Sequence, residues 1–274
     1  MPKLHRLVQH PHRKQFQTLI FSWWASHKRD LPWRRTHDPY KILVSEIMLQ
    51  QTQVSRVLPK YKDFLTKFPD IQSLAGANTA DVLRAWKGLG YNRRALYLKK
   101  TADAITNNWK GKFPKSENEL VKLPGLGKYT ARAILVFAYE KDIPLVDTNI
   151  RQIITHYFFD DMPQKDSVIW ETAEDLLPRG KSWKWHQALM DYGATELQKI
   201  PGIIKKQKKF KGSNRFYRGR IIDLLRKKSY TTTQLIRYLR KKYTKSESDI
   251  RIVLDGLIRE GLVCKNTQVL QLPD

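Results

Sequence analysis

The stretch Leu123-Pro124-Gly125-Leu126-Gly127-Lys128-Tyr129-Thr130 places two glycines around one apolar residue, directly before the apolar run from Ala131 to Tyr139. Apolar residues at helical spacing predict a helix over that run, so the glycines form a tight turn at its N-terminus. Such a turn exposes backbone N–H groups where the helix dipole favours negative charge, and glycine lets a phosphate approach closely. By itself the stretch fits a phosphate-binding helical hairpin and an ordinary turn between helices equally well.

The chain before residue 200 is predicted to be helical throughout. Apolar residues recur at helical spacing, as at Phe16, Leu19 and Ile20, and strand-like alternation is scarce. Prolines, as in Leu31-Pro32, divide the region into segments of helix length. We therefore expect an all-α domain over residues 16–200, preceded by a flexible N-terminus over residues 1–15.

The composition changes near Ile200. Residues 205–220 hold eight Lys and Arg and no acidic residue, so we expect a basic linker over residues 201–215. Its lysines are candidate phosphate ligands, with a solvated linker as the alternative: Lys205, Lys206, Lys208 and Lys209.

Beyond the linker, three short helical patterns precede a stretch of alternating apolar residues from Leu262 to Leu272. Ser246 is placed to cap the third helix, and Lys265-Asn266 is the expected turn between two strands. Three helices followed by a hairpin is the order of a winged helix. We therefore expect a small winged-helix-like α+β module over residues 216–274, with the helices at 216–227, 232–242 and 246–260.

The charge of the chain favours a polyanionic partner. Its 274 residues include 51 Lys+Arg against 26 Asp+Glu, a formal net charge of +25. The only cysteine, Cys264, excludes a disulfide framework and a four-cysteine metal or iron–sulfur site. Apolar runs are too short for a membrane span. We expect a soluble, cytoplasmic, nucleoid-associated protein with no metal, and interpret His5, His10 and His12 as part of a solvated terminus.

Four further motifs accompany the glycine turn, and with it they carry a family resemblance: Arg29-Asp30-Leu31-Pro32-Trp33-Arg34, Ser45-Glu46-Ile47-Met48-Leu49-Gln50-Gln51-Thr52, Gly88-Leu89-Gly90-Tyr91 and Val146-Asp147-Thr148-Asn149. In this order, over about residues 16–198, they resemble the helix–hairpin–helix DNA glycosylase superfamily, and most closely its MutY-type adenine DNA glycosylases. The resemblance implies a two-lobed helical fold and base excision repair. It also implies flipping and hydrolytic removal of adenine mispaired with 8-oxoguanine or guanine.

The resemblance assigns the catalytic residues. Glu46 matches the general acid and base that protonates the leaving adenine, and Asp147 matches the carboxylate that stabilises the sugar cation, with Asn149 beside it. Tyr129 stands where the endonuclease III branch has its Schiff-base lysine, which implies a monofunctional glycosylase. Without the family, Glu46 would be a solvated helix residue and Asp147 a helix N-cap.

The resemblance also assigns DNA-binding and pocket residues. One set wedges into the duplex and holds the orphaned base, with core packing as the alternative for Leu89 and Tyr91: Gln51, Thr52, Leu89, Gly90 and Tyr91. The hairpin set faces phosphates: Gly125, Gly127, Lys128 and Thr130. A third set lines or supports the base pocket: Arg29, Trp33, Arg34 and Asp191. For Trp33 and Arg34 the alternatives are a core aromatic and a surface ion pair.

The chain departs from the family in two places. The four cysteines that bind an iron–sulfur cluster in most MutY-type enzymes are absent after Asp191, so we expect no cofactor. The usual C-terminal domain, which resembles a nucleotide hydrolase and reads 8-oxoguanine, is replaced by the winged-helix-like segment. The opposite-base preference therefore stays open.

Two other functions fit parts of the sequence. A thymine or uracil mismatch glycosylase branch shares segments like Asp38-Pro39-Tyr40 and Gly127-Lys128-Tyr129-Thr130, whereas Gln50-Gln51-Thr52 favours adenine. A catalytically silent DNA-binding protein is the third possibility, and the intact Glu46 and Asp147 argue against it. For the enzyme we expect a monomer acting on double-stranded DNA with a mismatch or an oxidised base, followed by abasic-site repair enzymes.

Overall fold

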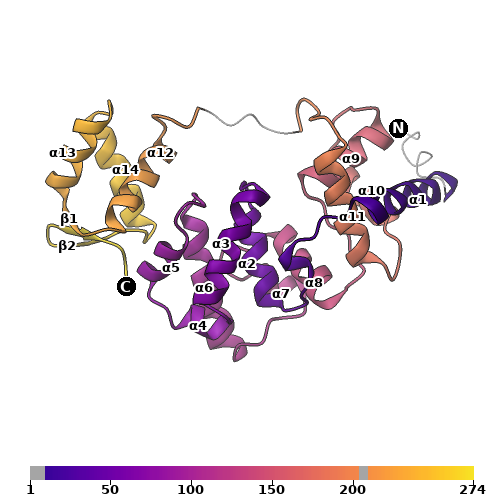
Figure 1. Ribbon diagram of the computed structural model, residues 1–274, viewed down its shortest axis with the longest axis horizontal. Helices are drawn as coiled ribbons and strands as arrows, with labels where there is room; N and C mark the ends of the chain where they lie inside the picture. Colours follow the sequence, from indigo (N-terminus) through magenta and orange to yellow (C-terminus); the bar gives the residue numbers. More distant parts are fainter. Residues whose placement is uncertain (1–9, 204–208) are drawn as a thin grey trace. The chain divides into compact units, whose positions relative to one another are not determined.

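The computed structural model describes residues 10–203 and 209–274, and these residues are mostly helical (Figure 1). The helices before residue 204 have these bounds: α1 (His10–His27), a 3-10 turn (Pro32–Arg34), α2 (Pro39–Leu49), α3 (Val54–Lys67), α4 (Ile71–Ala75), α5 (Thr79–Ala85), α6 (Arg93–Trp109), α7 (Glu117–Leu120), α8 (Lys128–Tyr139), α9 (Thr148–Phe159), α10 (Asp166–Asp175) and α11 (Ser182–Thr195). The predicted all-α class of this region is confirmed. In the described ranges no helix is both long and apolar enough to cross a membrane.

Helix α1 begins earlier than the sequence analysis places the folded region. The predicted flexible N-terminus runs to residue 15, whereas α1 begins at His10. The first apolar residue at helical spacing is Phe16, so periodicity shows only the later part of the helix. A proline near the N-terminus, as Pro11, is compatible with a helix because the N–H that it lacks has no intrahelical partner there.

The chain forms two compact units, and each is built from separate stretches of sequence. The first unit takes in the chain up to Leu43, Lys115–Lys122 and Leu126–Lys206. The second unit takes in Val44–Pro114, Leu123–Gly125 and the chain from Gln207 on. This division differs from the linear order of domains that the sequence suggests, because it groups the C-terminal module with α3 to α6.

In the first unit, α11 lies at the centre and packs against α1 and α9. Phe16 of α1 meets Trp185 of α11 edge to face, with ring centroids 5.8 Å apart. Ile20 and Trp185 are almost fully buried, at 0% and 1% exposed. Burial of such large side chains is the main source of stability in a helical unit.

In the second unit, α6 is the central helix and packs against α4 and α5. Phe64 of α3 and Trp86, the C-cap of α5, meet edge to face at 5.9 Å, and both are buried. Asp70 caps α4 through a reciprocal capping box with Ser73, which satisfies N–H groups that would otherwise lack partners.

The C-terminal module belongs to the second unit and contains the three predicted helices and the hairpin. Its elements are listed in chain order: α12 (Asn214–Leu225), β1 (Tyr230–Thr231), α13 (Thr232–Lys242), α14 (Glu247–Arg259), β2 (Cys264–Asn266) and β3 (Val269–Gln271). The strands form one antiparallel sheet in the order β1-β3-β2. Ser246 caps α14 by accepting a hydrogen bond from the N–H of Asp249, which confirms the predicted helix start.

The hairpin turn is not where the sequence analysis places it. Lys265 and Asn266 lie in β2, opposite Leu270 and Val269. The turn follows them, and Thr267 has a positive φ of 54°. The prediction was wrong because Asn favours turns in general, whereas the register is decided by pairing with the buried Leu270. Strand β1 was not predicted, since two residues show no alternation.

The glycine-rich turn links α7 and α8, which pack against each other in the first unit. Arg132 of α8 and Glu117 of α7 form an ion pair at 2.8 Å. The turn residue Gly125 has a φ of 78°, and a Cβ built there would lie 2.6 Å from Cβ of Tyr97. Gly125 therefore meets both a conformational and a steric requirement for glycine.

We expect Gly125→Ala to lower the free energy of unfolding by about 1–3 kcal/mol, because it adds left-handed strain and a close contact. Gly127→Ala is the matched control, since a Cβ at Gly127 meets nothing within 4 Å. The control should change stability by about 0.5 kcal/mol or less. Urea unfolding of both variants measures the difference, and equal losses would contradict the packing argument.

Candidate functional site

Glu46 lies on α2 with its side chain buried. The residue is 8% exposed, and its neighbours Ser45 and Ile47 are 1% and 2% exposed. The interpretation of Glu46 as a solvated helix residue is therefore wrong. A carboxyl group in such surroundings is suited to hold or transfer a proton at a defined place, because little water competes for it.

The guanidinium of Arg94 fixes the end of the helix that carries Glu46. It donates hydrogen bonds to the carbonyl oxygens of Ile47 at 2.8 Å and Met48 at 3.0 Å. These are carbonyls of the last turn of α2, which have no partner within the helix. A cation at this end also interacts favourably with the helix dipole. Desolvation by burial lowers the pKa of Arg94 to about 10, so the side chain stays charged at neutral pH.

Arg94 also joins the two segments that the sequence analysis assigned to DNA. It donates to the carbonyl of Gln50 and to the hydroxyl of Thr52, at 2.5 Å and 3.0 Å. On the other side it donates to the carbonyls of Leu89 and Gly90, at 3.1 Å and 3.2 Å. One side chain therefore holds the predicted wedge residues of both segments next to each other in the second unit.

The wedge residues differ in exposure. Tyr91 is 36% exposed, and both Tyr91 and Gln51 adopt a positive φ, of 47° and 52°. Leu89 is only 2% exposed, so its side chain packs in the core, as the alternative interpretation predicted. Positive φ in residues other than glycine is strained and is found preferentially at functional sites.

Asp147 caps helix α9 in the first unit. Its carboxylate accepts hydrogen bonds from the N–H of Ile150 at 2.7 Å and from the side-chain amide of Asn149 at 3.1 Å. The residue is partly exposed, yet desolvation by the surrounding atoms raises its pKa. Gly193 of α11 allows the close approach, because a Cβ there would lie 2.9 Å from Cβ of Asn149. The N-cap role is observed, and it leaves the carboxylate oxygens in place for chemistry.

A buried histidine supports the backbone just before Asp147. His186 accepts a hydrogen bond from the N–H of Leu145 at its Nε2, at 2.7 Å, and its Nδ1 lies 2.8 Å from the carbonyl of Ser182. Nδ1 must carry the proton because a carbonyl only accepts. Desolvation lowers the pKa of His186 to about 4, so the ring is neutral when it makes these bonds.

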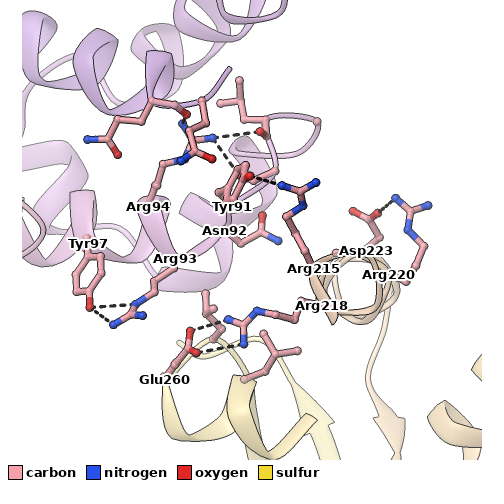
Figure 2. A pocket seen from close by; sticks show the side chains of 18 of the residues that line it. Tyr91, Asn92, Arg93, Arg94, Tyr97, Arg215, Arg218, Arg220, Asp223 and Glu260 are labelled. Carbon is pink, nitrogen blue, oxygen red and sulfur yellow. Dashed lines mark hydrogen bonds and ion pairs between the residues drawn. The ribbon is translucent and has the colours of Figure 1, made fainter. Parts of the chain in front are cut away.

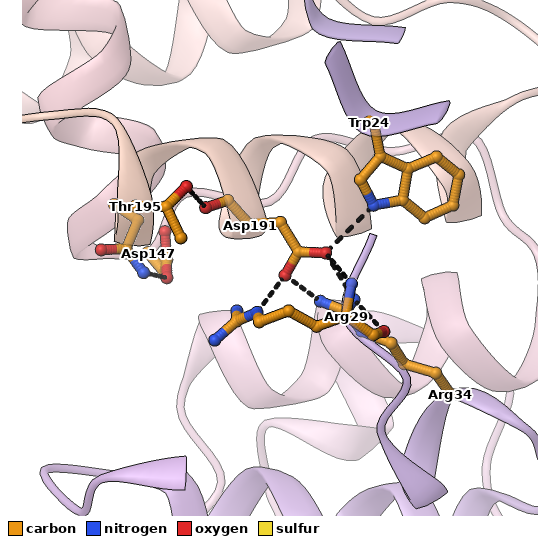
Figure 3. Close-up of polar contacts among 7 residues, drawn as sticks. Trp24, Arg29, Arg34, Asp147, Asp191 and Thr195 are labelled. Carbon is orange, nitrogen blue, oxygen red and sulfur yellow. Dashed lines mark hydrogen bonds and ion pairs between the residues drawn. The ribbon is translucent and has the colours of Figure 1, made fainter. Parts of the chain in front are cut away.

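Asp191 of α11 is the centre of a buried cluster in the first unit, shown in Figure 3. Arg34 forms a two-pronged ion pair with it, at 2.6 Å and 2.7 Å, and Arg29 donates to it at 2.5 Å. The indole of Trp24 adds a hydrogen bond at 3.0 Å. Burial alone would raise the pKa of Asp191, but the bonds and charges of Arg34 and Arg29 lower it overall. The cluster fixes the Arg29–Arg34 segment to α11, and Trp33 within it is buried.

The hairpin residues divide into exposed and buried ones. Gly125, Gly127 and Lys128 are exposed, whereas Thr130 is 3% exposed. The ammonium group of Lys128 lies over the ring of Trp170, 4.7 Å from its centroid. Tyr129 lies in the first turn of α8. Of the linker lysines, Lys209 is exposed, and Lys205, Lys206 and Lys208 lie outside the described residues.

Several supporting residues were not found by sequence reasoning. Arg94, His186 and Trp24 act through backbone groups or through a distant carboxylate, and such contacts leave no spacing pattern in one sequence. Within the residues that the structure describes, no three His, Cys, Asp or Glu side chains gather as metal ligands would.

The matches to known proteins include the segments that hold Glu46, the glycine-rich turn and Asp147. Residues 44–179 match the family described as "HhH-GPD superfamily base excision DNA repair protein". An adenine DNA glycosylase from Mycolicibacterium smegmatis is 34% identical over 268 residues, covering 89% of this chain and 91% of that protein. One from Buchnera aphidicola subsp. Baizongia pistaciae is 39% identical over 182 residues, but the match spans 65% of this chain and only 52% of that protein.

A solved structure of a DNA glycosylase is also similar to this chain in fold and in sequence. A thermostable thymine-DNA glycosylase has a TM-score of 0.63 and 32% identity, covering 68% of this chain and 87% of that chain. The chain therefore belongs to the HhH-GPD superfamily of base excision DNA repair proteins. The helix–hairpin–helix is the α7–turn–α8 segment described above.

We expect Arg94→Met to lower the free energy of unfolding by about 3 kcal/mol, because it leaves several carbonyl acceptors without their charged donor. Arg94→Lys keeps the charge but not the planar fork, and should lose less. Arg84→Met, which removes an exposed ion pair with Asp81, is the control and should lose under about 1 kcal/mol. Chemical unfolding measures all three. Equal losses for Arg94→Met and Arg84→Met would contradict the central role of Arg94.

We expect Asp147→Asn to stabilise the protein at neutral pH. A carboxyl whose folded pKa is raised favours the protonated state on folding, so its stabilising contribution is present at low pH and is lost as the pH rises through that pKa. The neutral amide avoids this loss, and the advantage of the variant should shrink as the pH falls. Asp70→Asn, at the exposed N-cap of α4, is the control. Thermal unfolding against pH tests this; a variant less stable than wild type at neutral pH would contradict it.

Proposed function

We propose that the chain is a monofunctional DNA glycosylase that removes adenine mispaired with 8-oxoguanine or guanine from double-stranded DNA. The observation that carries the proposal is the buried Glu46 in the Ser45–Thr52 motif. The adenine DNA glycosylase from Mycolicibacterium smegmatis, which matches over most of its length, supports adenine as the base. The chain belongs to a superfamily of base excision DNA repair proteins, which supports DNA repair as the process in which it acts.

The proposed reaction breaks the bond between C1′ of the sugar and N9 of adenine. Glu46 donates a proton to N7, so the electron pair of the breaking bond leaves with a neutral base. Positive charge develops on the sugar, and the carboxylate of Asp147 stabilises it. Water then adds to C1′ and gives its proton to Glu46, which restores the acid. The desolvation that raises the pKa of Asp147 also strengthens its attraction to a cation.

Tyr129 supports the monofunctional assignment. A phenol cannot form the imine that a lysine forms with the opened sugar, so strand cleavage by that route has no nucleophile at this position. We propose that the product is an abasic site, which other repair enzymes then process.

The start of α8 supports the proposed contact with DNA. Gly127 is the N-cap of α8 and provides no side-chain hydrogen bond to its first N–H groups. Such groups attract a phosphate oxygen at the positive end of the helix dipole. The exposed Gly125 and Lys128 leave room and add charge.

An iron–sulfur cluster of the MutY type does not fit the chain. Such a cluster requires four thiolate ligands, and Cys264 in β2 is the only cysteine. We propose that the reaction requires no such cluster and that the protein acts as a monomer.

A second candidate reaction is removal of thymine or uracil from mismatches with guanine. The structure of a thymine-DNA glycosylase, at 32% identity, favours it. The two candidates share the fold and the hairpin, so the excised base must be measured.

We expect single-turnover release of adenine, but not of thymine or uracil, from duplexes carrying A opposite 8-oxoguanine, A opposite G, T opposite G and U opposite G. Glu46→Gln should lower the rate about 10³-fold while mismatch affinity stays within a few-fold. Asp147→Asn should also lose most of the rate. Glu171→Gln, an exposed residue of α10, is the matched control.

The same assay separates the candidates. Release of thymine or uracil alone would replace adenine with the second reaction. Wild-type rates in Glu46→Gln would remove Glu46 from the mechanism, and silence on every duplex would leave a DNA-binding protein.

A further inference from the structure

A large cavity lies within the second unit, between the Gly88–Asn92 segment and helix α12 of the C-terminal module (Figure 2). Its volume is about 1010 Å³. Gln51 and Tyr91, two of the predicted orphan-base residues, line the cavity together with Arg215 and Arg218 of α12. The C-terminal module and the predicted wedge therefore share one concave surface.

The cavity carries a strong positive charge. Seven of its lining side chains are arginines, against the two acidic residues Asp223 and Glu260, so the formal sum is 7 − 2 = +5. A concave wall of low dielectric constant concentrates the field of such charges. An anion is therefore the natural occupant.

Several wall arginines donate hydrogen bonds to neutral oxygens, which leave the formal charge of the cavity unchanged. The guanidinium groups of Arg93 and Arg215 donate to the phenolic oxygens of Tyr97 and Tyr91, which are neutral acceptors. Arg94 likewise donates to carbonyl and hydroxyl oxygens. The two acidic residues pair with other arginines of the wall: Glu260 with Arg218 at 2.6 Å, and Asp223 with Arg220 and Arg226 at 2.8 Å and 2.6 Å.

Arg215 is held in a defined orientation at the cavity wall. Its guanidinium carbon lies 5.0 Å from the ring centroid of Phe210 and 5.3 Å from that of Tyr91. Helix α12 is itself fixed to the neighbouring segment, because Arg226 donates to the side chain of Asn92 at 2.8 Å and to the carbonyl of Leu83 at 2.9 Å. A preoriented guanidinium loses little entropy when it binds a phosphate through its fork.

We propose that this cavity binds a backbone phosphate of the DNA strand opposite the excised base, with Arg215 as the principal ligand. The proposal rests on the proposed function, which supplies the duplex and the strand with an orphaned base. It gives the C-terminal module a role in holding that strand beside Gln51 and Tyr91. The same chemistry would also bind free phosphate or a mononucleotide, so the test must separate these sources.

The test uses the full chain and a duplex with A opposite 8-oxoguanine, in which single phosphates are replaced one at a time by uncharged methylphosphonates on either strand. Binding is measured by fluorescence anisotropy for wild type, Arg215→Gln and Arg215→Lys. Arg237→Gln, an exposed arginine of α13 outside the cavity, is the matched control. Urea unfolding shows whether each variant is folded.

We expect Arg215→Gln to weaken binding about tenfold, Arg215→Lys to weaken it less, and Arg237→Gln to have less effect than Arg215→Gln. One methylphosphonate in the strand opposite the adenine should lower the DNA affinity of wild type to that of Arg215→Gln. The same methylphosphonate should not lower the DNA affinity of Arg215→Gln any further. The proposal would be overturned if every methylphosphonate weakened DNA binding by wild type and by Arg215→Gln to the same extent. It would also be overturned if the only methylphosphonates that weakened binding lay in the strand carrying the adenine.

Titration with inorganic phosphate and with a mononucleotide gives the remaining comparison. Binding of either one that depends on Arg215, with unchanged affinity for DNA in Arg215→Gln, would make the cavity a small-anion site and overturn the assignment to DNA. Base release by wild type is measured separately. If wild type released no base from any duplex, the proposed glycosylase activity would be refuted. The binding measurements would still show whether the cavity binds a DNA phosphate.

Discussion

The contacts of Arg94 are the constraint on which the second unit depends. One guanidinium satisfies carbonyls at the end of α2, in the Gln50–Thr52 turn and in the Leu89–Gly90 segment. These carbonyls belong to chain ends and loops, where no regular element supplies donors. The positive charge of Arg94 is partly buried, and the dipoles of several backbone carbonyl groups stabilise it in place of a carboxylate. The helix carrying Glu46 and both predicted wedge segments are positioned by the same group.

The first unit uses the opposite arrangement, because there a buried carboxylate collects donors. Asp191 accepts from Arg29, Arg34 and Trp24, so the segment after α1 is held against α11. Asp147 instead accepts from the uncharged Ile150 N–H and Asn149 amide, and its pKa rises while that of Asp191 falls. The comparison separates a structural acid, neutralised by arginines, from an acid whose charge is left for another cation.

The sequence was sufficient for the helical class, for the hairpin before α8 and for the order of the C-terminal module, because each has a local signal in periodicity, glycine or capping. It was insufficient for the burial of Leu89 and for the strand pairing around Thr267, which depend on tertiary packing. The supporting residues Arg94 and His186 bond to backbone atoms, so residue types alone do not reveal them.

The high net charge does not by itself locate a DNA surface. Arg34 and Arg29 are neutralised by Asp191, and Arg132 pairs with Glu117. Each of these cations has a structural contact that a count of lysines and arginines does not show. Only cations whose partners are neutral, at an exposed or concave surface, keep an attraction for phosphate. The wall formed by α12 and the Gly88–Asn92 segment meets both conditions, because its arginines outnumber its acids and donate largely to neutral oxygens.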